Sequence, residues 1–274
     1  MDVVEIEEEI SQGKRFEFGK NWTAFLSMLN EERISIAKNS LKEMLQTESL
    51  EGKTFLDIGS GSGLFSLSAR MLGATVTSFD YDPASVACAQ TLRNKYFPGD
   101  NSWTIHHGSV LDPEFLKGLQ TFNIVYSWGV LHHTGEMWQA FENVIPTVGK
   151  EGSLFIAIYN DEGSKSEFWL KVKKIYCSSA VGKLAVCSLF FPYYTLQAMI
   201  TSFTKKRNVF SEYRKNRGMS ITHDWHDWLG GLPFEVGSVE KIRTFFEARG
   251  FELANLKTIN GAGNNEFVFR RVSS

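Results

Sequence analysis

Residues 55–69 read FLDIGSGSGLFSLSA, and they decide the fold. A short apolar run meets an aspartate, passes through glycines at three alternate positions and turns apolar again at helical spacing. This pattern predicts a strand, a glycine-rich turn and the start of a helix. A turn of this kind places a bare backbone and the positive end of the helix dipole beside a ligand.

The residues around the glycines narrow the choice of ligand. The dinucleotide fingerprint G-x-G-x-x-G needs Gly or Ala at position 64, where this chain has Leu64, and no G-K-[ST] marks a P-loop. Instead, Asp57 precedes Gly59 by two residues, in the pattern D-x-G-x-G-x-G. A carboxylate there would repel a pyrophosphate but attracts the ammonium and sulfonium groups of S-adenosylmethionine (SAM). We therefore expect SAM as cofactor, with Asp80 accepting hydrogen bonds from its ribose and Tyr81 packing on its adenine.

Strands and helices alternate on either side of this stretch. We expect strands at 53–58, 74–80, 102–108, 122–128 and 152–160, and helices at 63–72, 83–96, 135–148 and 238–249. Such alternation predicts a parallel sheet covered by helices on both faces. Residues 251–259 and 264–271 form two more strands joined by NGAG. Only a hairpin makes so short a connection, so the last strand is expected to run antiparallel.

Composition is that of a cytoplasmic globular protein. The 274 residues suffice for one α/β domain with an insertion, and the net charge of −2 carries no polyanion-binding signature. Cys88, Cys177 and Cys187 show no CxxC spacing and are expected to be reduced thiols. The first ten residues, MDVVEIEEEI, lack the basic start and apolar core of a signal peptide.

Charge is nevertheless unevenly distributed. Residues 163–217 carry eleven Lys and Arg against Glu167 and Glu212, a net +9 that leaves −11 for the remainder of the chain. This basic insertion could contact RNA, but the acidity of everything outside it counts against nucleic acid.

A long uncharged run lies inside the insertion. Residues 184–203 contain no charge and are bracketed by Lys183 and by Lys205-Lys206-Arg207, a length compatible with a membrane span. A single crossing would separate the final hairpin from its sheet, and Pro192 predicts a division into two short helices. Two interpretations stay open: a helical cap over the active site, or an amphipathic segment, 184–207, that contacts an anionic membrane or a lipid-linked substrate.

With these motifs the chain resembles the class I SAM-dependent methyltransferases, specifically the small-molecule type with a VLHH motif after the fourth strand, here residues 130–133. The resemblance covers about residues 50–160 and the terminal hairpin. It implies a Rossmann-like, doubly wound, seven-stranded sheet of order 3-2-1-4-5-7-6 and methyl transfer to an O or N atom of a small or lipid-attached metabolite. We expect an N-terminal helical segment capping the cofactor (1–50), the SAM-binding core (51–162 and 236–274) and a mostly helical, basic and apolar cap insertion for the substrate (163–235).

The resemblance also implies a set of cofactor-binding residues. They are Asp57, Gly59, Ser60, Gly61 and Gly63 for the methionine moiety, Asp80 for the ribose, Ser109 and Val110 beside the adenine, and Ser127 and Trp128 beside the methyl donor. The segment FEFGKNWTAF (16–25) looks like the aromatic N-terminal helix that caps the cofactor in some of these enzymes, through Lys20 and Trp22. Packing of Trp22 against the sheet is the alternative role for that side chain.

Methyl transfer is an in-line displacement, so the protein must dock the nucleophile and, for an alcohol or phenol, remove its proton. His132 and His133 are the candidate bases, because imidazole titrates near neutral pH. We expect one of them, with His132 favoured, to face the substrate and the other to be structural.

Two further groups are candidate substrate contacts. The last strand begins with Asn264, Asn265 and Glu266, at the edge where the parallel strands end, so these residues form either a turn or a substrate clamp. Residues 217–237, RGMSITHDWHDWLGGLPFEVG, contribute the candidates Arg217, His223, Asp224 and Asp227, with a packed polar turn as the alternative. The H-x-x-H-D spacing lacks any established metal signature, so we expect no metal there.

Other functions stay open at this point. An RNA (tRNA) methyltransferase would use the basic insertion as its contact, and a nicotinamide-dependent oxidoreductase would use the glycine turn, although Leu64 counts against it. A SAM-binding protein without turnover is the third alternative. The acceptor and the oligomeric state are not determined by the sequence.

Overall fold

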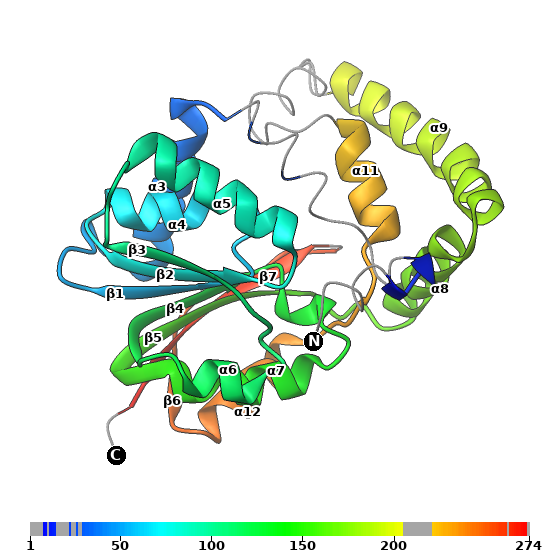
Figure 1. The fold of residues 1–274 in the computed structure, drawn as a ribbon. Helices are drawn as coiled ribbons and strands as arrows, with labels where there is room; N and C mark the ends of the chain where they lie inside the picture. The colour runs from blue at the N-terminus through cyan, green and yellow to red at the C-terminus, as the bar shows by residue number, and fades with distance from the viewer. Residues whose placement is uncertain are drawn as a thin grey trace.

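The computed structural model describes residues 8–9, 11–14, 22, 26, 29–204, 221–261 and 263–272. Its centre is one seven-stranded sheet of order β3-β2-β1-β4-β5-β7-β6, shown in Figure 1. The strands are β1 (Thr54–Ile58), β2 (Thr75–Asp80), β3 (Trp103–His107), β4 (Phe122–Trp128), β5 (Val148–Tyr159), β6 (Phe251–Lys257) and β7 (Asn264–Arg271). β7 runs antiparallel to both β5 and β6, while β1 to β5 pair in parallel. The predicted fold class, strand order and antiparallel last strand are confirmed.

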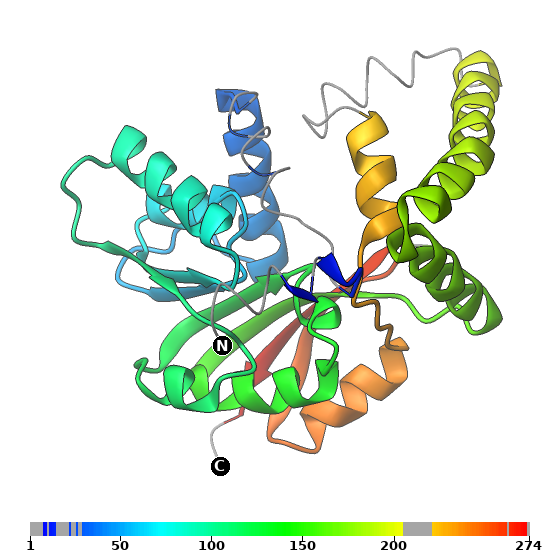
Figure 2. The ribbon, with the colours of Figure 1, turned by 45° about the vertical axis from the view of Figure 1, so that its right-hand side comes forward.

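Helices cover both faces of the sheet (Figures 1 and 2). One face carries α3 (Glu31–Leu45), α4 (Leu64–Met71) and α5 (Pro83–Tyr96); the other carries α6 (Pro113–Lys117), α7 (Met137–Val144) and α12 (Val239–Glu247). Two short 3₁₀ helices, η1 (Leu131–His133) and η2 (Ile145–Thr147), flank α7.

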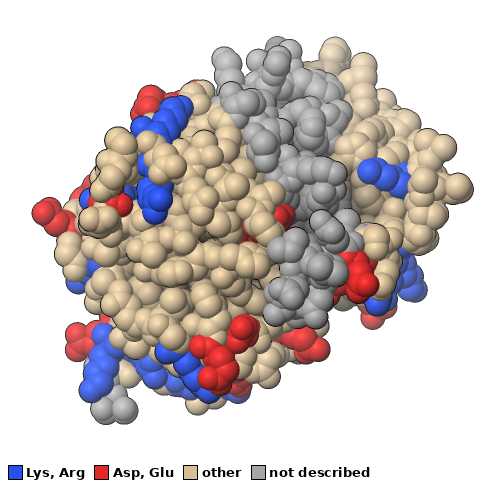
Figure 3. All heavy atoms as spheres, viewed as in Figure 1, with Lys and Arg blue, Asp and Glu red and all other residues tan. Residues whose placement is uncertain are grey.

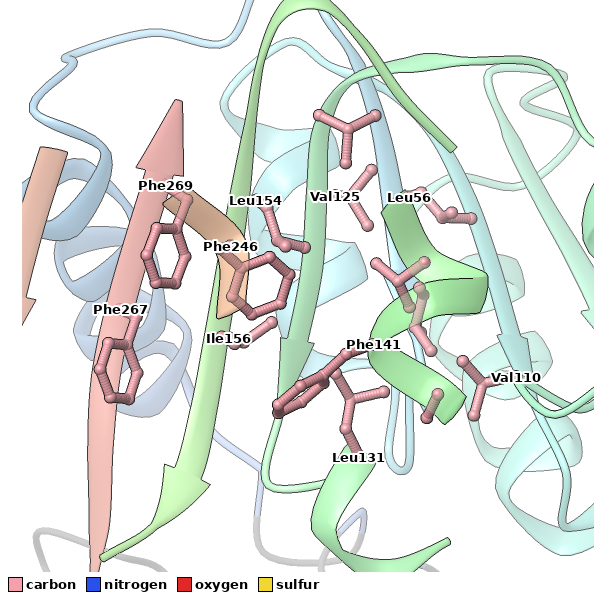
Figure 4. Close-up of a cluster of buried hydrophobic side chains, with 14 of the residues drawn as sticks. Leu56, Val110, Val125, Leu131, Phe141, Leu154, Ile156, Phe246, Phe267 and Phe269 are labelled. Carbon is pink, nitrogen blue, oxygen red and sulfur yellow. The ribbon is translucent and has the colours of Figure 1, made fainter. Parts of the chain in front are cut away.

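Each face has its own buried cluster of apolar side chains. Figure 4 shows the cluster on the α7 and α12 side, where Phe141 and Phe246 from the helices meet Leu154, Ile156 and Phe269 from the strands. Because the central strands β1, β4 and β5 are largely buried, the sheet is a rigid platform for the residues that follow its strands.

One edge of this platform collects the carboxyl ends of β1, β2, β4 and β5 together with the amino end of β7. The register places Asp57 beside Tyr126, and Trp128 beside Ala157, which in turn pairs with Glu266. Ligands of open α/β sheets bind outside the carboxyl ends of the strands, so this edge is the place to look for a site.

The insertion forms a separate helical unit at the side of this edge. It consists of α8 (Ser164–Ser178), α9 (Ala180–Thr204) and α11 (Ile221–Gly230), with a small apolar cluster of its own. Figures 1 and 2 show α9 as the outermost element on that side of the molecule. These three helices lie within residues 163–235, and the assignment of that range as a cap insertion for the substrate stays a prediction.

The prediction of two short helices divided at Pro192 is wrong, because α9 is one helix of 25 residues that includes Pro192. Proline inside a helix costs about 3 kcal/mol, so tertiary contacts must offset that cost. Aromatic side chains just before and after Pro192 supply them. The Phe191 ring lies 5.3 Å from that of Trp225, and the Tyr194 ring lies 5.4 Å from the same indole.

Candidate active site

The glycine loop follows β1 directly and adopts a conformation that side chains would block. Gly59 and Gly61 have positive φ angles of 70° and 52°. A Cβ at Gly59 would lie 2.5 Å from Val130 Cγ1, and one at Gly61 would lie 2.9 Å from Trp22 Cε2. The glycines are therefore required both by the backbone angles and by close neighbours on two sides.

The N–H groups of this loop are already bonded inside the protein. Gly59 and Ser60 donate to the carbonyl of Phe79 at 2.9 and 3.1 Å, Gly61 donates to Asp80 Oδ2 at 2.8 Å, and Gly63 donates to the carbonyl of Ser60 at 2.8 Å. A phosphate bound by a glycine loop needs such N–H groups turned towards it. The loop is thus better suited to a ligand that presents donors and positive charge than to a pyrophosphate.

Two carboxylates lie beneath the loop, Asp57 buried and Asp80 half-buried. Asp57 accepts a hydrogen bond from Ser66 Oγ at 2.5 Å, which lowers its pKa. Burial, together with a smaller effect of the Asp80 charge, outweighs this bond and raises the pKa of Asp57 to about 7. Burial raises the pKa of Asp80 to about 6, although its carboxylate also accepts from the N–H of Asp82 at 2.9 Å. Both raised values mean that negative charge here is held without sufficient compensation, which a cationic ligand would supply.

The residues expected around an adenine and ribose line up at the ends of β2 and β3. The carbonyl of Tyr81 is bonded to His107 Nε2 at 2.8 Å, which fixes the chain just after Asp80. Ser109 Oγ accepts from Leu111 N at 3.1 Å and so shapes the turn after β3. The side chain of Val110 instead lies in the apolar cluster on the α7 side, so only its backbone could contact a ligand.

The N-terminal segment reaches the loop through one described residue. Trp22 lies against Gly61, because a Cβ at Gly61 would come within 3.2 Å of three atoms of its indole. Lys20 and Arg217 lie outside the described residues. The position of Trp22 is compatible with either role expected for it, a cap on a ligand or a packing contact.

Unsatisfied polar atoms gather between the loop and the start of β7. Ser60 Oγ, Tyr126 Oη, Asn264 Oδ1 and Glu266 Oε2 are buried and make no hydrogen bond with a described residue. Burial raises the pKa of Glu266, although the charge of Lys257 and a hydrogen bond from Trp128 each lower it in part. Buried polar atoms are nearly always satisfied, so this group indicates a place where a ligand completes the bonding. By contrast, Ser127 Oγ donates to the Ile58 carbonyl at 3.2 Å and ties β4 to β1.

The two histidines of η1 occupy different environments. His132 is fully buried, and its ring lies 4.1 Å from that of Tyr159 and 4.4 Å from that of His133. Burial lowers the pKa of His132 well below its ordinary value, and nearby His133 and Lys173 add to this. His133 is half-buried and donates from Nδ1 to the carbonyl of Pro233 at 2.6 Å, which leaves Nε2 as its basic nitrogen. The structure thus gives the more accessible position to His133, whereas the sequence favoured His132.

The remaining substrate candidates separate into structural and unassigned residues. Asn265 is buried, accepts from Ile259 N and donates to Asn160 Oδ1, both at 3.0 Å, so its amide serves the hairpin turn. His223, Asp224 and Asp227 belong to α11, but their side chains are outside the described part of the structure. Within the described residues, no group of three or more His, Cys, Asp or Glu is placed to hold a metal ion.

Sequence reasoning missed a buried lysine and its aromatic surroundings. Lys173 of α8 is fully buried, donates to the carbonyl of Trp228, and has its Nζ 4.6 Å from the Trp228 ring and 4.9 Å from the Phe234 ring. Tyr159 joins this group to His132, with its ring 5.3 Å from that of Phe234. As the last residue of an apolar strand, Tyr159 could have been found from its place at the carboxyl edge; Lys173 gave no such signal.

Two clefts are open to solvent near the sheet. One of 340 Å³ is lined by Gly13, Lys14, Leu170, Lys174, Leu232, Pro233, Phe234 and Glu235. It is linked to the histidines through Pro233, whose carbonyl accepts from His133. A larger one, of 590 Å³, is lined by Lys53, Asn123 and Arg271 at the opposite ends of their strands. The larger cleft therefore does not belong to the candidate site.

The seven-stranded sheet and its strand order define a Rossmann-like methyltransferase fold, and solved structures agree. The magnesium protoporphyrin IX methyltransferase from Synechocystis PCC 6803 with bound SAH superimposes with a TM-score of 0.53 at 13% identity, over 88% of this chain and 84% of that one. An O-methyltransferase family protein from Burkholderia thailandensis gives 0.54 at 12% identity, over 88% and 57%. Similarity at this identity is evidence of the fold.

The sequence places the chain in a family. The family described as "Methyltransferase domain" matches residues 29–256, and the chain belongs to it. Among curated relatives, a ubiquinone biosynthesis O-methyltransferase of Rhizobium leguminosarum bv. trifolii is 29% identical over 40% of this chain and 42% of its own length. A tRNA U34 carboxymethyltransferase of Alteromonas mediterranea is 29% identical over 43% of this chain and 36% of its own length. The chain thus covers less than half of each of these relatives.

Proposed function

We propose that this methyltransferase uses SAM to methylate an O or N atom of a small or lipid-attached metabolite in the cytoplasm. One observation carries the proposal: a glycine loop most of whose N–H groups bond within the protein lies over two carboxylates with raised pKa values. This arrangement favours a cationic ligand lying against the bare glycine backbone over a ligand that carries a phosphate. The unsatisfied Ser60 Oγ in the loop fits a polar ligand at the same place.

The residues that would hold SAM follow from this arrangement. Asp57, at the end of β1, would balance the positive charge of SAM, the glycine loop would lie against its methionine portion, and Asp80 would contact its ribose. When bound, SAM would supply an activated methyl carbon for attack by the nucleophile, with S-adenosylhomocysteine as the leaving group. The family match favours this chemistry over that of a nicotinamide-dependent oxidoreductase.

The protein's own contribution is to position the acceptor and accept its proton. His133 Nε2 is the basic nitrogen nearest the Pro233 cleft, and His132 stays neutral behind it because burial depresses its pKa. A neutral His132 packed on Tyr159 fixes the His133 ring without competing for the proton. Aromatic rings of Tyr159, Trp228 and Phe234 provide apolar walls for an acceptor. The similarity to a ubiquinone biosynthesis O-methyltransferase supports an oxygen acceptor of this kind.

Calorimetry followed by methyl tracing tests the proposal. SAM and S-adenosylhomocysteine (SAH) should bind, while NAD should not. With methyl-labelled SAM and a cell extract, label should then enter the small-molecule or lipid fraction. Binding of NAD in preference to SAM would contradict the proposal, and so would SAM binding without label transfer to any fraction.

RNA is the second candidate acceptor. The tRNA-modifying relative and the net +9 of residues 163–217 favour it, and the acidity of the remaining chain opposes it. The same tracing experiment separates the two, because label in the RNA fraction, with salt-dependent tRNA binding, would replace the metabolite proposal.

A further inference from the structure

The outer face of α9 is a continuous apolar stripe that no described residue covers. Leu189, Tyr193, Leu196, Ile200 and Phe203 follow one another at spacings of four and three residues, and each is between 54% and 87% exposed. Soluble proteins rarely expose a contiguous apolar surface without a partner for it. By length and composition α9 could cross a membrane, and only 11% of its most apolar 18-residue window is buried.

The opposite face of α9 is committed to the protein. Val186 and Ala198 are buried, the Phe190 ring lies 5.4 Å from Trp169, and the Phe191 ring lies 4.9 Å from His226. The chain that follows α9 also returns to form β7, which pairs with β5 in the central sheet. A crossing helix would lose these contacts and divide the sheet, so α9 can only lie along a surface with its outer face inserted.

Charge is arranged at the ends of this helix and not along it. Lys183 is exposed in its first turn, Lys205-Lys206-Arg207 follow its last residue in the sequence, and the stretch between holds no charge. On α8, Lys171 and Lys174 are exposed as well. Figure 3 shows the α9 region, at the right of the view, as mostly uncharged spheres. An apolar centre between cationic ends matches acyl chains bordered by anionic headgroups.

A second copy of the chain fits this pattern less well. Pairing two α9 helices, parallel or antiparallel, would bring the cationic end of one beside a cationic end of the other. The stripe from Leu189 to Phe203 also covers two heptads, fewer than the three or four that a coiled coil requires. Neither flank of the stripe carries the charged residues that select a partner helix.

We propose that α9 is a membrane-surface helix, with its outer stripe inserted among the acyl chains of an anionic bilayer and the cations at its ends on the headgroups. At about 1.5 Å per residue its 25 residues extend over roughly 37 Å, which lets several side chains insert together. The inference is independent of the acceptor and of the methyl-transfer activity.

Flotation of the purified full-length protein with lipid vesicles tests the proposal. The protein should float with vesicles of phosphatidylcholine mixed with phosphatidylglycerol, more strongly at low than at high salt, and only weakly with phosphatidylcholine alone. The double variant Leu196→Gln, Ile200→Gln should partition at least about tenfold less. Lys183→Gln should weaken binding to the anionic vesicles by about fivefold and leave the weak neutral binding unchanged.

A matched control isolates the stripe from general surface polarity. Ile36→Gln with Val272→Gln also replaces two exposed apolar residues, outside the insertion, and should float like the unmodified protein. Circular dichroism and thermal unfolding check that each variant is folded. Absence of vesicle binding by the unmodified protein at low salt would overturn the proposal, as would unchanged binding of the stripe variant. A dimer in analytical ultracentrifugation that the stripe variant dissociates would assign the stripe to a second copy instead.

Discussion

The glycine loop after β1 and the α8–α9–α11 unit differ in which charges they bury and which apolar surface they expose. The loop covers two carboxylates, the buried Asp57 and the half-buried Asp80, with a backbone most of whose N–H groups are engaged. The helical unit buries one cation, Lys173, among aromatic rings and exposes a stripe of large apolar side chains. The loop therefore presents negative charge that a cationic ligand would balance. The helical unit presents apolar surface that an apolar partner would cover.

Replacing the charge at the loop should give the largest effect. Asp57→Asn keeps an acceptor for Ser66 but removes the negative charge, so SAM affinity measured by calorimetry should fall about 100-fold. Stability without SAM should move the other way. The pKa of Asp57 is about 7 in the folded protein, against an ordinary 3.8. Its carboxyl group therefore lowers the free energy of unfolding as pH rises through that interval.

At pH 8 this penalty amounts to something on the order of 4 kcal/mol, and the Asp57→Asn variant should recover part of it as a higher unfolding midpoint. Asp112→Asn is the control, because Asp112 caps α6 at an exposed position and asparagine caps equally well. A variant with lower stability and unchanged SAM affinity would show that Asp57 is a structural residue only.

A second prediction separates backbone strain from ligand contact. Gly61→Ala forces a side chain into a positive φ and against Trp22, which should weaken SAM binding by about 30-fold. Gly99→Ala carries a comparable φ of 75° with no atom within 4 Å of the added Cβ. Both variants should lose stability in urea unfolding, Gly61→Ala more than Gly99→Ala because of the contact with Trp22, but only the first should lose affinity. Equal affinities would place the ligand away from Gly61.

How much could be predicted from the sequence differs between the two regions for a physical reason. The bounds 83–96, 122–128 and 264–271 and the paired acids followed from local signals, since glycine turns, proline at a first helical turn and apolar periodicity act over a few residues. The strand order came instead from the resemblance to the methyltransferases, because no local signal sets which strands pair. The short helix α6 escaped notice because five residues give no periodicity, although Asp112 before Pro113 is a capping signal.

The helical unit depends instead on contacts between distant residues. Lys173 meets Trp228, 55 residues away, and Phe191 meets Trp225 from another helix. No local pattern announces such pairs, and they also carry α9 past Pro192. For the same reason the choice between His132 and His133 depended on burial by Tyr159 and the position of Pro233, which one sequence does not reveal.

A pH titration of SAM binding sharpens the assignment of the cation-binding group. With the pKa of Asp57 at about 7 and that of Asp80 at about 6, affinity should rise about tenfold from pH 6 to pH 8 as Asp57 loses its proton. The step near pH 7 should vanish in Asp57→Asn, leaving only a smaller change at lower pH. Affinity that falls with rising pH would contradict an ionised Asp57 as the partner of the cofactor's positive charge.

The smallest effect should come from the interior of the helical unit. Tyr176→Phe removes the hydrogen bond between Tyr176 Oη and His226 Nδ1, 2.7 Å long, and should lower the free energy of unfolding by about 1 kcal/mol. Tyr193→Phe changes an exposed tyrosine on α9 and should leave the urea midpoint unchanged. SAM affinity should be the same in both variants, because this bond lies within α8 and α11 while the carboxylates lie on β1 and β2. A loss of SAM affinity in Tyr176→Phe would mean that the unit and the loop are coupled, and that packing in the insertion sets the geometry of the cofactor site.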